Sequence, residues 1–452
     1  MQREITALWG EKKVFLRQTP RAVTPFGGLS VLIEFLRKIG YRQQVSAHLP
    51  VHLKSPNAID PGETFTAFLI SVVVGARRFA HTTLLRADRS LHALLGMRRF
   101  PSDDTIRNLF KRFRHGLVVQ FYEPLGAWQL ARVPKRAGGY SLDLDSTVFE
   151  RYGTQEGVKR GYNPRKHGRA SHHPLLAVLG EANFILHGWL RSGNTRSDSG
   201  VVEFLKEGLA KLESRRWIRV IRADSGFCAQ ELLPYLESLE LHYIVVARLT
   251  KWLKREAARV QEWRALDATY AVGEFRLKLL GWDRERRFVA VREQVRETKR
   301  SLGRKLLEVP GYTFRVFVTN RTEAPEEIWR DYNQRAGIEQ RIEELKSDLA
   351  ADDFCLREFF ATEAAFLGIL MLFNLLGEFQ RATGMSGYRQ PATLRVQVFL
   401  CGAILGRASH RTVLHLSAAW GGLDERNSLF DKLLHYEIPT SPKLELQPLA
   451  ST

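Results

Sequence analysis

Alternating hydrophobic and polar positions are clearest over residues 139–149. Apolar side chains at every second position alternate there with Ser141, Asp143 and Asp145. A period of two is typical of a β-strand whose two faces differ. We therefore predict a strand that carries both aspartates on one face.

Apolar runs downstream predict further strands and a helix among them. The helix is predicted over residues 198–212, and the strands over residues 174–180, 184–190, 218–221 and 242–247. Asp224 comes shortly after the third of these strands, and Gly226 permits a tight turn behind it. We expect the turn to leave Asp224 exposed at the carboxyl end of its strand, where open α/β sheets bind ligands.

A helical period is clearest over residues 331–348, shortly after Pro325, which suits a first helical position. At about 100° of rotation per residue, four side chains share a strip about 60° wide. They are Tyr332, Arg335, Glu339 and Lys346. Apolar residues fall directly beside the strip: Ile338, Ile342, Leu345 and Leu349. The pattern predicts a helix that buries one stripe and places a carboxylate between two cations at its edge.

The spacing Y-x-x-R-x-x-x-E-x-x-x-x-x-x-K over residues 332–346 resembles the signature of the DDE transposases of bacterial insertion sequences. The resemblance extends to L-D-S-T around Asp145, S-G-N-T-R-S-D at residues 192–198 and R-A-D-S-G-F around Asp224. It implies an α/β fold, with an RNase-H-like mixed-sheet core, a β-rich insertion, and helical N-terminal and C-terminal regions. The predicted order of strands and helices agrees with such a core.

The resemblance and the composition together predict four regions. A loop rich in Pro, Lys, Arg and Gly precedes the core at residues 134–139. The regions are a helical N-terminal DNA-binding region (1–137), the core (138–248 and 321–380), the β-rich insertion (249–320), and a helical C-terminal region with a tail (381–452). Helices outside the core signature are expected over residues 29–39, 65–74, 100–113, 363–380 and 392–405.

The expected catalytic residues, which are also the expected metal ligands, are Asp145, Asp224 and Glu339. Phosphodiester cleavage by this route uses two ions about 3.5–4 Å apart, and Mg²⁺ prefers oxygen ligands. We expect Mg²⁺, with Mn²⁺ as a substitute. The alternation alone does not separate Asp143 from Asp145. The resemblance selects Asp145, which Ser146 follows and which lies nearer the strand's carboxyl end, and it leaves Asp143 a supporting role.

The formal net charge of +19, from 68 Lys+Arg against 49 Asp+Glu, favours a polyanionic partner. The basic loop at residues 159–169 is a candidate for gripping phosphates. The residues expected to contact double-stranded DNA are Tyr332, Arg335 and Lys346 on the signature helix, and Arg165, Lys166 and Arg169 in the loop.

The resemblance implies a DNA transposase that cuts at the terminal inverted repeats of a mobile element. The freed 3′ ends would then be joined to target DNA, with the protein acting as a homodimer on DNA. Two alternatives stay open, namely an RNase-H-like nuclease without strand transfer and an inactive DNA-binding relative. The three carboxylates disfavour the second alternative.

The composition also predicts where the protein acts. Three cysteines lie far apart without metal-ligand spacing, so we expect reduced thiols. The N-terminus has no apolar signal-peptide region, and the longest apolar runs, residues 65–76 and 364–376, are too short to span a bilayer. We therefore expect a protein of the bacterial cytoplasm, associated with the nucleoid and not with a membrane.

Overall fold

The computed structural model describes residues 3–161, 163, 166–294, 311–420 and 423–438. These residues form two compact units. The larger, here called the sheet unit, is built chiefly from Phe110–Glu378. The smaller, here called the helical unit, combines the described part of Met1–Ser46 with Val51–Leu109 and Phe379–Tyr436. The units divide the chain differently from the predicted regions, because the helix and loop after Phe110 pack into the core of the sheet unit.

Five strands form the centre of the sheet unit in the order β9-β8-β4-β10-β11. They are β4 (Tyr140–Ser146), β8 (Leu175–Leu179), β9 (Phe184–Trp189), β10 (Ile218–Ala223) and β11 (Tyr243–Val246). β8 runs antiparallel to β4 and β9, whereas β10 runs parallel to β4 and β11. The first three strands are a meander, and crossover helices connect the others. This arrangement confirms the predicted RNase-H-like order of elements.

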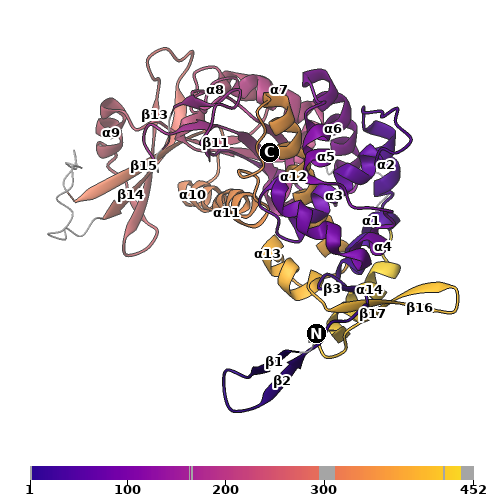
Figure 1. Cartoon of the computed structure of the whole chain (residues 1–452). Coiled ribbons are helices and arrows are strands. Elements are labelled where there is room, and N and C mark those ends of the chain that lie inside the picture. The colour runs from indigo at the N-terminus through magenta and orange to yellow at the C-terminus, as the bar shows by residue number, and fades with distance from the viewer. Residues whose placement is uncertain (1–2, 162, 164–165, 295–310, 421–422, 439–452) are drawn as a thin grey trace. The chain divides into compact units, whose positions relative to one another are not determined.

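The predicted β-rich insertion continues the same sheet (Figure 1). Its elements are α9 (Lys251–Ala258), β12 (Arg264–Ala265), β13 (Tyr270–Leu277), β14 (Arg286–Gln294) and β15 (Tyr312–Thr319). β15 pairs antiparallel with both β14 and β11, so a nine-stranded sheet results. The remaining insertion residues, 295–310, lie outside the described residues.

Helices cover both faces of the sheet. α7 (Val201–Ala210) and α8 (Leu232–Ser238) share one apolar core with the Leu142 face of β4. α10 (Pro325–Asn333) packs on the opposite face, where Tyr332 lies in a second core. The ring of Tyr332 is 4.7 Å from the ring of Phe317 on β15. α10 and the helix that follows it thus cover the face of β4 that carries Asp143 and Asp145.

The signature helix is not continuous, in contrast to the prediction. α10 ends at Asn333, α11 spans Ala336–Glu343, and a π-helical turn spans Glu344–Asp348. Between α10 and α11 the backbone forms i→i+3 hydrogen bonds, from Gln334 N to Asp331 O and from Arg335 N to Tyr332 O. A constant rotation of about 100° per residue therefore fails between Tyr332 and Lys346. The predicted apolar stripe beside the strip is nevertheless buried.

α12 (Phe359–Ala382) extends beyond the predicted apolar run of residues 364–376, and by length and composition alone it could cross a membrane. However, 78% of its most apolar window is buried inside the protein. The Asn374 side-chain oxygen accepts a hydrogen bond from Ile185 N on β9 at 2.8 Å, and its Nδ2 donates to the carbonyl oxygen of Ile185 at 2.9 Å. Glu378 forms a buried ion pair with Arg132. Such satisfied polar contacts are those of a core helix.

Four of the five helices predicted outside the signature are confirmed, as α1 (Leu29–Lys38), α3 (Pro61–Val73), α5 (Asp103–Phe110) and α12. The fifth begins as α13 (Pro391–Leu394). Further helices, which were not predicted individually, are α2 (Tyr41–His48), α4 (Arg89–Leu95), α6 (His115–Leu130) and α14 (Leu423–Leu434). α3 shows how the sequence specifies a start, because Asp60 accepts hydrogen bonds from Gly62 N and Glu63 N and Pro61 takes the first turn. The N-terminal region also contains short strands, β1 (Arg3–Thr6), β2 (Lys13–Leu16) and β3 (Val23–Thr24).

The helix predicted over residues 392–405 was wrong beyond Phe399. β16 (Ala403–Ala408) pairs antiparallel with β17 (Arg411–Leu416) and with β3. The pairing with β3 depends on a segment almost the whole chain away. The local apolar spacing could not reveal this, because a short apolar run suits a buried helix and a strand equally.

Candidate active site

Asp145 and Asp224 lie at the carboxyl ends of two adjacent parallel strands. In the register of β4 and β10, Arg222 is opposite Asp143 and Ala223 is opposite Leu144. Asp224 thus follows β10 at the level of Asp145, and the two aspartates project from the same face because residues two apart share a face. Each carboxylate accepts a local backbone hydrogen bond, Asp145 from Ser146 N at 2.8 Å and Asp224 from Gly226 N at 2.9 Å.

The turn after Asp224 differs in detail from the prediction. Residues Ser225–Phe227 form one 3₁₀ turn that Asp224 caps, and Gly226 is not at positive φ. A Cβ at Gly226 would lie 3.1 Å from Cβ of Ser197, so glycine serves here to let the Ser197 loop approach closely.

Arg335 links Glu339 on α11 to the same edge of the sheet. The Arg335 guanidinium lies 3.3 Å from the Asp145 carboxylate and 3.8 Å from the Glu339 carboxylate. It also donates a hydrogen bond to the carbonyl oxygen of Leu144 at 2.8 Å. The Arg335 side chain is only 5% exposed, whereas the Glu339 side chain is 70% exposed. Arg335 therefore anchors the start of α11 to β4 and leaves Glu339 at the surface.

The pKa of Asp145 reflects its burial and the charges of both other carboxylates. Burial raises the pKa of Asp145 to about 6. Arg335 opposes this rise, while the negative charges of Asp224 and Glu339 add to it. Mutual repulsion of this kind is relieved by a bound cation, and carboxylate oxygens are the ligands that hard divalent cations prefer. The chemistry of the three donors therefore fits a divalent metal ion.

The three carboxylates do not converge on one point. Within the described ranges, no three His, Cys, Asp or Glu side chains are grouped as metal ligands. Arg335, not a third carboxylate, is the group that contacts both Asp145 and Glu339.

Tyr332 and Arg335 do not have the positions expected of phosphate contacts. Tyr332 is 6% exposed and packs on Phe317. Arg335 is buried against β4, so both side chains stabilise the site from beneath. Lys346 donates from Nζ to the carbonyl oxygen of Val148 at 3.2 Å and is half-buried near the end of β4. Helix periodicity placed these residues on one strip but gave no information on depth.

The basic loop follows β4 in the chain and is held by a small sheet. The strands of this sheet are β5 (Phe149–Glu150), β6 (Lys159–Arg160) and β7 (Ala170–His172). Lys166 is exposed and pairs with Glu150 at 2.9 Å. The Arg169 guanidinium lies 4.9 Å from the centre of the Tyr152 ring and is also exposed. The third predicted contact of this loop, Arg165, lies outside the described residues.

A hydrogen-bonded chain beside Asp145 was not predicted. His173 Nδ1 lies 2.7 Å from the carbonyl oxygen of Thr195, so this nitrogen carries the proton and donates it. His173 Nε2 then accepts from the hydroxyl of Ser146 at 3.1 Å, and Ser146 Oγ lies 3.0 Å from Ser197 Oγ. Burial lowers the pKa of His173, which keeps the ring neutral. The chain fixes the residue after Asp145 against the Ser197 loop.

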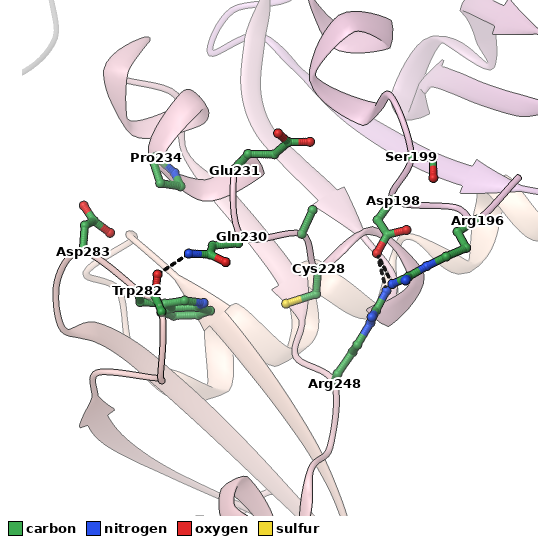
Figure 2. Close-up of a pocket in the computed structure, with 12 residues that line it drawn as sticks. Arg196, Asp198, Ser199, Cys228, Gln230, Glu231, Pro234, Arg248, Trp282 and Asp283 are labelled. Carbon is green, nitrogen blue, oxygen red and sulfur yellow. Dashed lines mark hydrogen bonds and ion pairs between the residues drawn. The ribbon is translucent and has the colours of Figure 1, made fainter.

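A cleft of about 760 Å³ opens next to the Asp224 turn. Figure 2 shows Arg196 and Arg248 on one wall, both directed at Asp198. Their guanidinium groups lie 2.7 and 2.6 Å from the same Asp198 oxygen. Glu231 and Asp283 add further negative charge to the lining. Acidic side chains outnumber the arginines, so the cleft does not have the charge of a phosphate groove.

Three arginines surround Asp331 on α10. Arg219 donates to its carboxylate at 2.5 and 3.1 Å, Arg222 donates at 3.0 Å, and Arg321 also pairs with it. Burial favours the neutral acid, but the hydrogen bonds from Arg219 and Arg321 outweigh it and lower the pKa of Asp331 to about 2. This cluster could not be predicted from local patterns, because its members come from β10, α10 and the segment after β15.

This cluster predicts a pH-dependent stability. The folded pKa of Asp331 is below its ordinary value of 3.8, so its contribution is present above about pH 4 and is lost as the pH falls toward 2. Asp331→Asn should therefore lower the free energy of unfolding by about 2 kcal/mol at neutral pH. Urea unfolding of both proteins between pH 3 and pH 7 should show this gap closing toward the acid end. A gap that is constant over this range would contradict the assignment.

The strand order is that of an RNase-H-like fold. Carboxylates lie at the ends of β4 and β10 and on a covering helix, which is the arrangement of RNase-H-like enzymes that bind metal ions through carboxylates. Residues 6–437 match the family model described as "Transposase DDE domain group 1". The chain belongs to this family and is a DNA transposase, a metal-dependent enzyme of DNA cleavage and strand transfer. The family implies a divalent metal ion as cofactor and DNA as substrate.

No curated protein matches the chain. Among solved structures, the chain is similar to the "Cryo-EM structure of piggyBac transposase synaptic complex with hairpin DNA (SNHP)", with 12% sequence identity and a TM-score of 0.43. The similarity covers 84% of this chain and 82% of that one.

Proposed function

We propose that Asp145, Asp224 and Glu339 hold Mg²⁺, or Mn²⁺ in its place, and that this site cuts the ends of a mobile element at its inverted repeats. The observation that carries the proposal is the placement of Asp145 and Asp224 side by side at one sheet edge, with Glu339 coupled to Asp145 both through Arg335 and by charge. Asp143 is proposed to have a supporting role, because Arg222 occupies both of its carboxylate oxygens.

Other residues of the chain position the three carboxylates at this edge and offset their negative charge. When bound, the divalent ions would activate the attacking oxygen and stabilise the leaving oxygen. Arg335 holds α11 against β4, and the His173–Ser146–Ser197 chain holds the strand end that carries Asp145. Because Glu339 is exposed, it is the carboxylate with most freedom to adjust to a metal and its DNA substrate.

A strand-transfer assay tests the proposed function. Purified full-length protein with Mg²⁺ and a DNA end bearing a free 3′-hydroxyl should join that end to a circular target plasmid. Cleavage without joining would instead support the RNase-H-like nuclease alternative. Binding without either reaction would support the inactive relative.

The DNA contacts are proposed to include Lys346, Arg165 and the exposed loop residues Lys166 and Arg169. Tyr332 and Arg335 are proposed to act from beneath, through packing and charge, because both are buried. We also propose that the protein acts as a homodimer on DNA, at the nucleoid of a bacterial cell.

The loop predicts a measurable salt dependence. Log affinity for duplex DNA should fall linearly with log salt, with a slope of about −0.9 per phosphate neutralised. Substituting Arg165, Lys166 and Arg169 together by alanine should make the slope shallower by roughly 2–3. Arg215 and Arg216 lie before the amino end of β10, so their joint substitution is the control and should change the slope less. Equal slopes for the loop variant and the native protein would exclude the loop from the DNA interface.

A further inference from the structure

Arg222 lies directly beneath the two strand aspartates. It is 2% exposed, precedes Asp224 by two residues on β10, and is opposite Asp143 in the register with β4. Because residues two apart on a strand share a face, the pair of Arg222 and Asp143 forms the layer below Asp224 and Asp145. That layer is about 6.6 Å deeper along the strands.

The Arg222 guanidinium joins three elements at once. Nε and Nη2 donate to the two carboxylate oxygens of Asp143 on β4, at 2.6 and 2.9 Å. Nη1 donates to the backbone carbonyl and to the carboxylate of Asp331 on α10, at 2.6 and 3.0 Å. Nη2 also donates to Ser141 Oγ at 2.8 Å. The planar guanidinium group of Arg222 therefore fixes the spacing of β4, β10 and α10.

Each of these elements carries or precedes one of the proposed metal ligands. β4 ends with Asp145, β10 leads into Asp224, and α10 continues through the tight turn into α11 with Glu339. Arg335 attaches the start of α11 to the carbonyl oxygen of Leu144, between Asp143 and Asp145. A change in the Arg222 contacts would thus alter the distance between carboxylates that come from separate parts of the chain.

The energetics favour a positioning role over a purely stabilising one. A buried ion pair often gives no more net stability than well-packed apolar side chains would. Outer-shell partners of metal ligands, in contrast, typically change metal affinity by about 10–100-fold when they are removed. Lysine keeps the charge of arginine but lacks its planar set of donors, so it cannot hold Asp143 and Asp331 together.

We propose that Arg222 is a positioning residue that sets the spacing of Asp145, Asp224 and Glu339 for binding of a divalent metal ion. This inference rests on the proposed function of these three residues as the ligands. It assigns Arg222 no contact with metal or DNA.

The test measures Mn²⁺ binding to the full-length, DNA-free protein by electron paramagnetic resonance or calorimetry. Thermal unfolding is measured in parallel, and binding is compared well below the unfolding transition. Arg222→Lys should weaken Mn²⁺ binding by about 10–100-fold. Asp331→Asn removes the charge on the α10 side of the network but keeps the bond from Arg222 to the backbone carbonyl, so it should weaken binding by a smaller factor. If Arg222→Lys does not fold, the comparison of Asp331→Asn with the native protein tests the inference instead.

The matched control is Arg132→Lys. Arg132 belongs to the same sheet unit, is equally buried, and donates from Nε and Nη2 to Glu378 at 2.5 and 2.7 Å. Its side-chain partners among the described residues are Glu378 and Trp128, and neither lies on an element that carries a proposed ligand. Arg132→Lys should lower the unfolding temperature and leave the Mn²⁺ affinity unchanged. An equal loss of affinity in this control would overturn the inference, because affinity would then follow general stability.

Asp224→Ala separates this inference from the proposed function. If Asp224→Ala binds Mn²⁺ as tightly as the native protein, the proposed metal site itself is wrong. If Asp224→Ala loses binding while folded Arg222→Lys, or Asp331→Asn in its place, binds normally, only the role of Arg222 is wrong. Loss of binding in Asp224→Ala together with graded losses in Arg222→Lys and Asp331→Asn supports both.

Discussion

Asp224→Ala and Glu339→Gln should each abolish DNA cleavage while leaving DNA binding largely intact. Each change removes one proposed metal ligand from a site where the metal supplies several kcal/mol of transition-state stabilisation. The expected loss of rate is therefore at least about a thousand-fold. The measurement is cleavage of a labelled DNA end by the purified variants in Mg²⁺, alongside a binding assay at the same salt concentration.

The control for Glu339 is Glu343, an exposed carboxylate at the end of α11, one turn further along. Glu343→Gln makes the same chemical change on the same helix and should leave cleavage close to the native rate. Retained cutting by Asp224→Ala or Glu339→Gln would remove that residue from the active site. Lost cutting by Glu343→Gln would show that charge on this helix, not a ligand at Glu339, is what the reaction needs.

The elements of the core could be predicted because the sequence patterns that specify them are local. The strand of residues 140–146 alternates with a period of two, and the apolar stripe of Ile338, Ile342, Leu345 and Leu349 recurs at helical spacing. Both patterns depend on which residues face the core, and the structure buries those same residues. The placement of Asp145 and Asp224 at one edge follows from parallel strands having their carboxyl ends on the same side.

The break after α10 could not be predicted from helical spacing. Asp331 is held by Arg219 and Arg222 from β10 and by Arg321 from beyond β15. The backbone tightens immediately after Asp331, which lets Arg335 also reach β4. A helical wheel takes no account of contacts from distant segments, so it placed Arg335 and Lys346 on one strip at equal depth.

The depth of Arg335 could not be predicted from helical spacing either. An arginine beside a carboxylate on a helix edge has the chemistry of a phosphate contact, and the spacing alone supports that interpretation. The structure instead gives Arg335 a carbonyl oxygen and a carboxylate from β4 as partners. Arg222 was missed for a related reason. Alternation around Asp224 could have placed it on the carboxylate face, but nothing local identified Asp143 and Asp331 as its partners.

The two aspartates of β4 should respond in opposite ways to the same substitution. Asp145→Asn should eliminate turnover and weaken Mg²⁺ binding, because Asp145 lies at the strand end among Asp224, Glu339 and Arg335. Asp143→Asn should leave measurable cleavage. Both oxygens of Asp143 face Arg222, and an asparagine keeps one acceptor oxygen for that guanidinium. The expected cost of Asp143→Asn is a lower unfolding temperature and slower, not absent, cleavage.

A metal swap makes the choice between the two aspartates sharper. Asp145→Cys should shift any residual activity from Mg²⁺ toward a softer ion such as Mn²⁺, because a thiolate is a poor ligand for Mg²⁺. Asp143→Cys should show no such shift, since Arg222 binds both oxygens of Asp143. Cleavage is measured for both variants over a range of Mg²⁺ and Mn²⁺ concentrations, with folding checked by circular dichroism. If Asp143→Asn is folded and inactive while Asp145→Asn still cuts, Asp143 is the ligand and Asp145 its support.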